Sequence, residues 1–175
     1  GPQLQLQHLN SQDLWQTEFL SQAQVIEHAV AHLEAGKILA VKGIGGIHLV
    51  CDPSNKKACR VLRERKRRPS KPFALMGASL TDIKAVAEVS DTAQKWLESV
   101  SAPIVLLPQK TDSSTFISEL IAPLQSKLGI MLPSNPLHHL LLGAWKKRNS
   151  HGLLVFTSAN LSGQPQIYED GIALK

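Results

Sequence analysis

Residues 38–76 read ILAVKGIGGIHLVCDPSNKKACRVLRERKRRPSKPFALM, and the order of apolar runs in this stretch decides the fold class. Two short apolar runs, 38–41 and 47–51, flank a glycine-rich segment and have the length of strands. A helix is predicted from about residue 56, and an apolar run at 73–76 that follows two prolines predicts another strand. The stretch therefore predicts two strands, a helix and a third strand in succession.

The rest of the chain continues this alternation. Capping residues and helical spacing predict helices that begin after Ser21, Ser79, Ser90 and Asn135, and apolar runs predict strands at 104–107 and 153–156. The last helix is expected to bury a face made of Leu137, Leu140, Leu141, Ala144 and Trp145. The predicted fold class is α/β, with one domain at residues 22–175 after an extended lead-in segment, residues 1–21.

Composition excludes several classes of protein. Of the 175 residues, 43% are hydrophobic and 19% are charged, which argues against a disordered chain or a coiled coil. No apolar run approaches the roughly 20 residues that cross a bilayer, and no signal peptide is recognisable, so no membrane partner is expected. The two cysteines, Cys51 and Cys59, lack zinc-site spacing and do not suggest a disulfide scaffold. A cytoplasmic location is expected.

Charge is concentrated in one segment. Residues 56–71 hold nine Lys or Arg and one Glu, a net charge of +8, whereas the rest of the chain holds ten basic and thirteen acidic residues. If the helix in this segment buries Ala58, Val61 and Leu62, its cations face solvent. This distribution predicts an anionic partner that binds at one place.

The turn after this helix holds four cations and two prolines. They are Lys66, Arg67, Arg68 and Lys71, with Pro69 and Pro72. Cations held together by a stiff backbone can form charge-assisted hydrogen bonds with phosphate or carboxylate oxygens. Two other interpretations stay open: a solvated helix face, and an RNA-binding surface. Against RNA, the only nearby aromatic residue is Phe73, whose neighbours indicate burial, so no base-stacking platform is evident.

Two further segments offer groups that could contact a ligand. The glycine segment 42–46 has neither the P-loop order nor the third glycine of a dinucleotide fingerprint, so it predicts either a tight turn or backbone that a ligand approaches closely. Residues 157–163 place hydroxyls and an amide after the last strand, where α/β sheets tend to bind ligands, although capping a turn is the commoner role of such groups. The seven histidines form no metal signature.

These segments together resemble the YrdC-like family. The matching residues are KGIGGIHLVCD at 42–52, RERKRRPSKPFALM at 63–76, LGIMLP and PLHHLL at 128–133 and 136–141, and TSANLSG at 157–163. Their joint occurrence is far more specific than any one segment. The chain is most similar to the domain as it occurs in hydrogenase-maturation carbamoyltransferases of the HypF family. The resemblance implies a twisted, open mixed sheet with flanking helices and a basic cavity.

The wider family also contains the threonylcarbamoyl-adenylate synthases of transfer-RNA modification. They share the Lys-x-Arg-Pro and Ser-x-Asn elements, matched here by residues 66–69 and 158–160. Where this chain has Lys42, Gly43 and Ile44, those synthases carry a Pro-Thr-Glu-type sequence. The resemblance therefore favours the carbamoyl branch, and the synthase is the alternative.

In the carbamoyl branch the domain is thought to join carbamate to ATP, giving carbamoyl-adenylate and pyrophosphate. The resemblance thus implies an enzyme, a carbamoyltransferase domain that uses carbamate and ATP with Mg²⁺. It also implies two protein partners. One is a downstream carbamoyl-transfer domain of the full-length protein, and the other is a maturation partner whose C-terminal cysteine accepts the carbamoyl group during assembly of nickel–iron hydrogenase.

The resemblance also implies roles for individual residues. Lys66, Arg68 and Lys71 are expected to contact the phosphates and to carry catalysis. Contacts to nucleotide or substrate are expected from a second set: Lys42, Gly45, Gly46, His48, Arg67, Pro133, Ser158, Asn160 and Ser162. Because carbamate is already an anion, its attack on the α-phosphorus needs alignment and charge neutralisation more than a strong general base.

Overall fold

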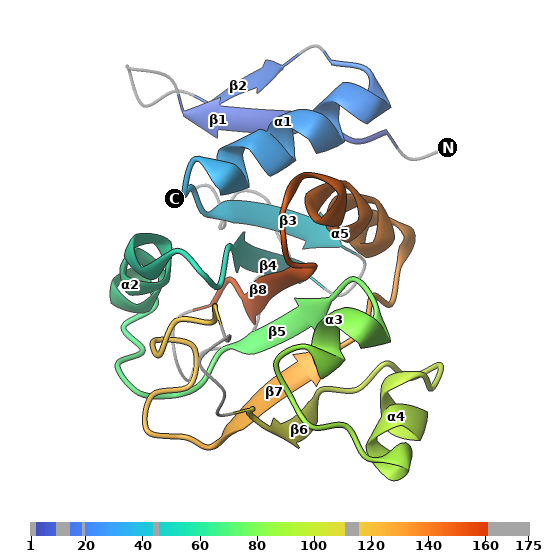
Figure 1. Ribbon diagram of the computed structural model, residues 1–175. Coiled ribbons are helices and arrows are strands. Elements are labelled where there is room, and N and C mark those ends of the chain that lie inside the picture. The colour runs from blue at the N-terminus through green and yellow to red at the C-terminus, as the bar shows by residue number, and fades with distance from the viewer. Residues whose placement is uncertain (1–2, 10–14, 19, 44–45, 111–115, 161–175) are drawn as a thin grey trace.

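A six-stranded mixed sheet forms the centre of the computed structural model, which describes residues 3–9, 15–18, 20–43, 46–110 and 116–160 (Figure 1). The strand order is β3-β4-β8-β5-β7-β6. The strands are β3 (Leu39–Gly43), β4 (Gly46–Cys51), β5 (Ala74–Gly77), β6 (Val105–Pro108), β7 (Lys127–Met131) and β8 (Leu153–Ser158). The helices are α1 (Gln22–Glu34), α2 (Lys56–Arg65), α3 (Leu80–Lys84), α4 (Asp91–Leu97) and α5 (Pro136–Arg148). The predicted α/β class is confirmed.

Pairing within the sheet is mixed. β3 and β4 form an antiparallel hairpin, which Gly43 and Gly46 close as register partners. Gly46 has a φ of 114°, a value that side chains with a Cβ rarely adopt, so this position requires glycine. β8 lies antiparallel between β4 and β5, and β5 and β7 run parallel.

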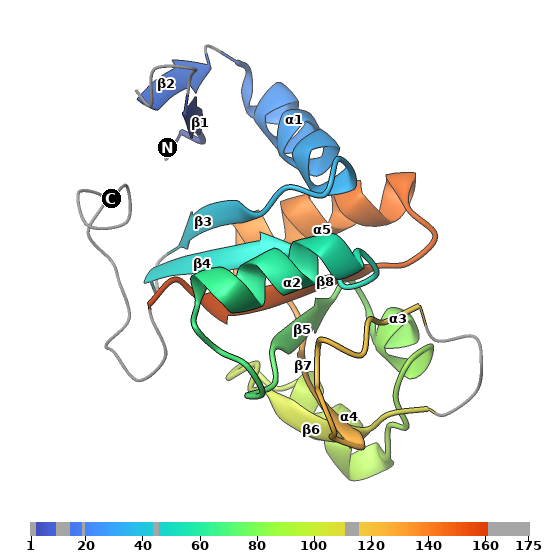
Figure 2. The same ribbon diagram turned by 90° about the vertical axis from the view of Figure 1, so that its left-hand side faces the viewer.

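Helices cover both faces of the sheet and bury a separate core on each. On one face, α2 packs through Ala58, Cys59 and Leu62 into a core that also holds residues of α3 and α4. On the other face, α1 and α5 bury a second core that includes Val30 and Trp145. Figure 2 shows α2 and α5 on opposite sides of the sheet.

The predicted helix starts are confirmed by their caps. Side-chain oxygens of Ser21, Asn55, Ser79, Ser90 and Asn135 each accept a hydrogen bond from a main-chain N–H in the first turn of the helix that follows. These bonds satisfy donors that a helix N-terminus otherwise leaves without a partner.

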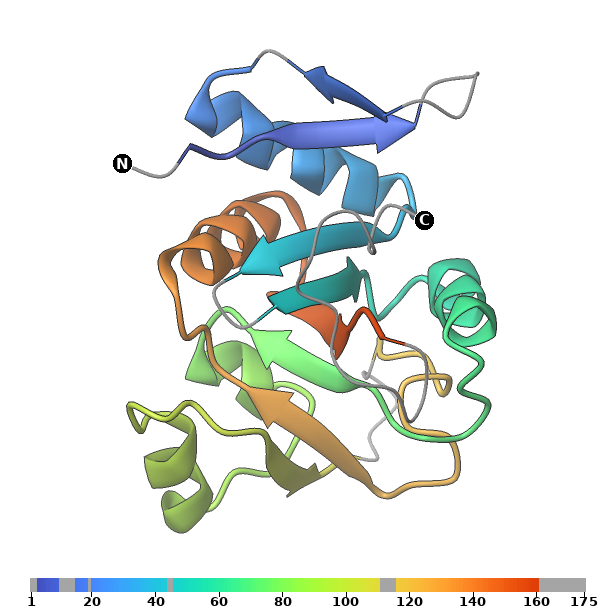
Figure 3. The same cartoon turned by 180° about the vertical axis from the view of Figure 1, so that it is seen from behind.

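The structure departs from the sequence prediction in three places. The lead-in contains a second, two-stranded antiparallel sheet, β1 (Leu6–Leu9) and β2 (Trp15–Glu18), which lies beside α1 (Figures 1 and 3). β7 was not predicted as a strand. The buried face of α5 is also rotated: His138 and Leu142 are buried, whereas Leu140 is 54% exposed, because α5 packs against both α1 and the sheet.

Both cysteines are free and buried, as expected of ordinary thiols. Cys51 ends β4 and Cys59 lies in α2, so both belong to the core under α2. In the part of the chain that the structure describes, no helix has the length and apolarity needed to cross a membrane.

Candidate functional site

The candidate site lies at one edge of the sheet, where β8 ends and β4 and β5 begin. Register fixes this arrangement, since His48 near the start of β4 pairs with Ser158 at the end of β8, and Ala74 at the start of β5 pairs with Phe156. The turn that leads from α2 into β5, residues 66–72, reaches the same edge and is called the basic turn below. Residues 158–160 are called the Ser-Ala-Asn segment.

Lys66 joins the basic turn to the Ser-Ala-Asn segment. It is the C-cap residue of α2 and is only 2% exposed. Its Nζ donates hydrogen bonds to the main-chain carbonyl oxygens of Ser158 and Asn160, the latter at 2.6 Å. Two stretches more than 90 positions apart in the chain therefore meet at this edge of the sheet.

Burial changes the chemistry of the Lys66 amine. It lowers the pKa of Lys66 to about 8, and the nearby positive charge of Arg68 adds to the effect. An ammonium group has three N–H donors, of which the two carbonyl oxygens take two. Among the described residues no other group accepts a hydrogen bond from Lys66, so within this part of the chain one donor of a charged Lys66 is left for an anion.

The Ser-Ala-Asn segment is held in place from two sides. The Ser158 hydroxyl donates to Oδ1 of Asn160, and the Ala159 N–H donates to the carbonyl oxygen of Ile47 at 2.9 Å. The second bond continues the β4–β8 pairing beyond the last residue of β8. The two carbonyl oxygens that receive Lys66 therefore have a defined position.

The Arg68 side chain contacts both the basic turn and β8. Its guanidinium donates to the carbonyl oxygens of Lys71, at 3.1 Å, and Pro72, and to Oγ1 of Thr157 at 3.4 Å. It also lies over the Phe73 ring, 5.3 Å from its centroid. Partial burial lowers the pKa of Arg68, but a guanidinium remains charged at neutral pH. The side chain both shapes the turn and brings positive charge to the site.

The prediction that the cations of this segment all face outward was wrong for Arg63 and Lys66, both of which are buried. Arg63 follows Cys59 by one helical turn, so both residues lie on the same face of α2, and this face packs against the core. This spacing was the available signal in the sequence, and it was missed because a charged residue was assumed to be exposed.

The four cations of the turn do not converge on one point. Arg67 and Lys71 are exposed, in contrast to Lys66. Arg67 has a φ of 48°, in the left-handed region. Its N–H donates to the carbonyl oxygen of Glu64, and the Arg68 N–H donates to that of Arg63. This is the Schellman pattern of helix termination, so Arg67 occupies a position whose backbone ends α2.

The first hairpin brings three more predicted residues to the same edge. Lys42 near the end of β3 is exposed, and Gly46 at the start of β4 is buried. His48 is half-buried, its ring 6.4 Å from that of His138 and 6.1 Å from that of Phe156. Burial lowers the pKa of His48. A neutral imidazole in this position can orient a ligand by hydrogen bonding but does not add charge.

Of the three remaining predicted residues, the structure describes only Pro133, and it lies away from this edge. Gly45 and Ser162 lie outside the described residues. Pro133 follows β7, which runs parallel to β5, and so lies toward the other end of the strands, where β8 begins. It lines a hollow of about 250 Å³ together with Ser79 and His139, away from Lys66.

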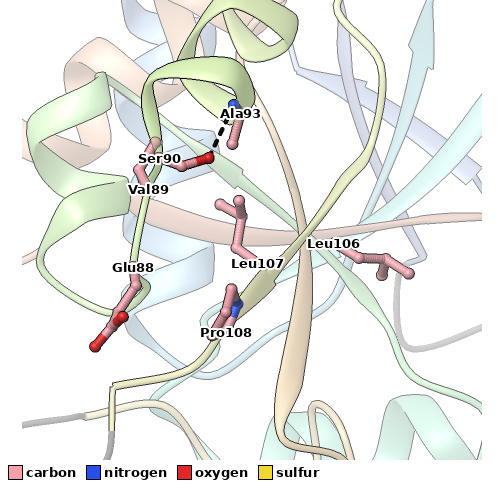
Figure 4. A pocket seen from close by; sticks show the side chains of 7 residues that line it. All are labelled: Glu88, Val89, Ser90, Ala93, Leu106, Leu107 and Pro108. Carbon is pink, nitrogen blue, oxygen red and sulfur yellow. Dashed lines mark hydrogen bonds between the residues drawn. The ribbon is translucent and has the colours of Figure 1, made fainter.

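A larger hollow of about 360 Å³ lies near the outer strand β6 (Figure 4). It is lined by Glu88, Val89, Ser90, Ala93, Leu106, Leu107 and Pro108. None of these is basic, so this hollow is not the predicted basic cavity. The cavity between the basic turn and the Ser-Ala-Asn segment stays a prediction.

Residues 31–174 match the Sua5/YciO/YrdC family, described as "Telomere recombination". The chain therefore belongs to the Sua5/YciO/YrdC family of α/β domains. Within it, the chain is 51% identical over 139 residues to the carbamoyltransferase HypF of Rhodobacter capsulatus, an alignment that covers 79% of this chain and 18% of that protein.

Two other comparisons are informative. A structure of full-length HypF in a phosphate- and nucleotide-bound form is similar with a TM-score of 0.79 and 35% identity, covering 90% of this chain and 19% of that one. A threonylcarbamoyl-AMP synthase of Vibrio campbellii is 28% identical over 144 residues, which is 79% of this chain and 74% of the synthase. The chain thus spans about a fifth of the length of the carbamoyltransferases it matches.

Proposed function

We propose that this chain is an adenylate-forming domain that joins carbamate to ATP, releasing pyrophosphate and keeping carbamoyl-AMP. The observation that carries the proposal is the Lys66 amine, which is buried and held against the Ser-Ala-Asn segment, and which keeps one donor for an anion as far as the described residues are concerned. Similarity to HypF, whose full-length structure binds nucleotide and phosphate, supports it further.

In the proposed reaction a carbamate oxygen attacks the α-phosphorus of ATP and forms a new P–O bond. The bond between the α-phosphorus and the oxygen that bridges it to the β-phosphorus breaks, and this oxygen leaves with pyrophosphate. Negative charge moves toward the departing pyrophosphate. Lys66 and Arg68 would stabilise this charge from fixed positions, so little reorganisation is needed during the reaction. Lys71, exposed at the end of the basic turn, would contact the outer phosphates.

Other groups at this edge would orient the substrates. The backbone at Gly46, which has no side chain, allows close approach of carbamate or phosphate. Ser158, Asn160 and the half-buried His48 would align ribose or phosphate oxygens. In the described chain no group of three or more His, Cys, Asp or Glu side chains is arranged to hold a metal ion, so Mg²⁺ would be carried mainly by the triphosphate oxygens.

Pyrophosphate release tests the proposal. The protein is incubated with MgATP and a carbamate source, and pyrophosphate is followed with and without carbamate. We expect carbamate-dependent release that falls about 100-fold in Lys66→Met, since a preorganised charged donor is removed. Lys57→Met, an exposed change in the same helix, is the matched control and leaves the rate unchanged. A correctly folded wild-type protein that releases no pyrophosphate contradicts the proposal.

Two alternatives give different results in the same assay. A threonylcarbamoyl-adenylate synthase would release pyrophosphate efficiently with threonine and bicarbonate, whereas we expect little turnover with this pair. An RNA-binding module would use the exposed cations of α2 and bind RNA with strong salt dependence but without competition from ATP. Phe73 is 1% exposed and offers no stacking surface, which weighs against the second alternative.

The reactivity of the proposed product, carbamoyl-AMP, suggests how this domain would work within a larger protein. Carbamoyl-AMP is a reactive anhydride that water would hydrolyse, so direct delivery to a downstream carbamoyl-transfer domain is expected. In the full-length protein that domain would pass the carbamoyl group to the C-terminal cysteine of a hydrogenase-maturation partner. Retention of carbamoyl-AMP by the isolated chain, measured after rapid filtration, tests this arrangement.

A further inference from the structure

Arg63 differs from the other cations of α2. Its side chain is only 7% exposed, and it points into the junction between the basic turn and residues 116–122. Among the described residues no carboxylate forms an ion pair with it. Burial lowers the pKa of Arg63, and the charge of Arg68 contributes. A buried guanidinium is costly unless its N–H donors are satisfied, so its partners require an explanation.

Those partners are main-chain carbonyl oxygens on two separate segments. Nη1 donates within the basic turn to Arg68 at 2.7 Å, Lys71 at 3.2 Å and Pro69 at 3.4 Å. Nε and Nη2 donate across to Leu120 at 2.6 Å and Ile121 at 3.3 Å. The planar fork of donors thus fastens the basic turn to the neighbouring loop, an arrangement that a single amine cannot reproduce.

Arg63 also holds the backbone of Arg68, through both its own main chain and its side chain. The Arg68 N–H donates to the main-chain carbonyl of Arg63, while the Arg68 carbonyl accepts from the Arg63 side chain. Both guanidinium groups lie over the Phe73 ring, at 4.5 Å for Arg63 and 5.3 Å for Arg68. The position of the basic turn therefore depends on contacts that converge on Arg63.

We propose that Arg63 is a positioning residue: its guanidinium holds the basic turn closed and thereby keeps Lys66 directed at the Ser-Ala-Asn segment. The expected effect of Arg63 on nucleotide binding rests on the proposed function. Its role in positioning the basic turn and Lys66 does not depend on that function. Arg63 itself contacts backbone only and is not placed against the substrate.

The test compares Arg63→Met, which keeps the apolar stem, and Arg63→Lys, which keeps the charge, with the exposed control Arg60→Met. Two quantities are measured in each folded variant: the dissociation constant for MgATP, by calorimetry, and the pH dependence of Lys66 labelling by an amine reagent, mapped by mass spectrometry. We expect both Arg63 variants to weaken MgATP binding at least tenfold and to raise the apparent pKa of Lys66 toward that of an exposed lysine. Arg60→Met should leave both quantities within twofold of wild type.

A folded Arg63→Met whose MgATP affinity and Lys66 titration equal those of wild type overturns the proposal. So does Arg63→Lys if it restores both, because charge alone would then suffice. If wild-type protein does not bind MgATP, the proposed function fails, and the Lys66 titration alone decides the role of Arg63.

A measurement on wild type covers the case in which the Arg63 variants do not fold. The Arg63 Nε–H should exchange with solvent more slowly than that of Arg60, because it donates to the Leu120 carbonyl oxygen. Ligand and Arg63 would stabilise the same closed turn, so saturating MgATP should slow this exchange several-fold further. An exchange rate that bound MgATP leaves unchanged contradicts the proposal.

Discussion

The Nζ of Lys66 lies 2.6 Å from the main-chain carbonyl oxygen of Asn160, a residue 94 positions later in the chain. This contact closes the edge of the sheet between the basic turn and β8. Because the donor is a side chain and the acceptor is backbone, the contact does not require a particular side chain at position 160. The pKa of Lys66 therefore reports whether the basic turn and the Ser-Ala-Asn segment are in contact.

Stability should depend on pH through Lys66. Its pKa is about 8 in the folded protein and near 10.5 in the unfolded chain, so the unfolded state binds more protons between these values. The free energy of unfolding should therefore rise, relative to Lys66→Met, as pH increases from about 8 to 10. Urea unfolding of both proteins across this range measures the effect. Parallel pH curves for the two proteins would contradict it.

Nucleotide affinity should change in the opposite direction. Only the charged form of Lys66 offers a third N–H donor and attracts phosphate. MgATP binding by wild type should weaken as pH rises above about 8, and Lys66→Met should lack this dependence. Calorimetric titration at several pH values checks this, with Lys57→Met expected to follow wild type. A wild-type affinity that stays constant through this range argues against phosphate contact by Lys66.

Arg67→Gly should stabilise the protein by about 1 kcal/mol, because Arg67 has a φ of 48° at the Schellman position of α2, where glycine is preferred. The matched control is Arg60→Gly, an exposed change within the same helix, which should destabilise by about 1 kcal/mol. Urea unfolding gives both values. Destabilisation by both substitutions would mean that the Arg67 side chain makes a larger contribution than its backbone strain.

Ser158→Ala should weaken nucleotide binding several-fold and cost about 1 kcal/mol of stability, since it removes the hydroxyl that donates to Oδ1 of Asn160. The carbonyl oxygens that accept from Lys66 remain. The pH dependence of Lys66 labelling should therefore persist, and Ser150→Ala, at an exposed site, serves as the control. If Ser158→Ala abolishes the shifted titration of Lys66, the hydroxyl is needed to hold the carbonyl oxygens in place.

Asp82→Asn should destabilise the protein by about 2 kcal/mol. Burial alone would raise the pKa of Asp82, but hydrogen bonds from Lys146 and Ser79 outweigh it, so its pKa lies below 3.8. The wild-type advantage should be full above pH 4 and should disappear as pH falls through the lower pKa of the folded state. Acid unfolding of the two proteins checks this. An advantage that does not decrease as pH falls below 4 would exclude the carboxylate charge as its cause.

Local signals in the sequence predicted much of the fold. Ser21, Asn135 and the other capping residues act within one helical turn, so the helix starts were predictable without tertiary information. The face of α5 was not, because Leu140 and His138 could each be buried until packing against α1 and the sheet decided between them. β7 was missed because it is a five-residue run that contains Gly129.

For the site, too, some features were predictable from the sequence and others depended on tertiary contacts. Sequence by itself determined which groups were available: a cluster of cations beside two prolines, a glycine-rich segment between two strands and a hydroxyl-rich segment after a strand. Only the tertiary structure decided which carbonyl oxygens Arg63 binds, that Arg67 ends a helix, and that Lys66 reaches the Ser-Ala-Asn segment. The physical reason is that these roles depend on desolvation and on contacts between residues far apart in the chain, which neither charge nor spacing along the chain specifies.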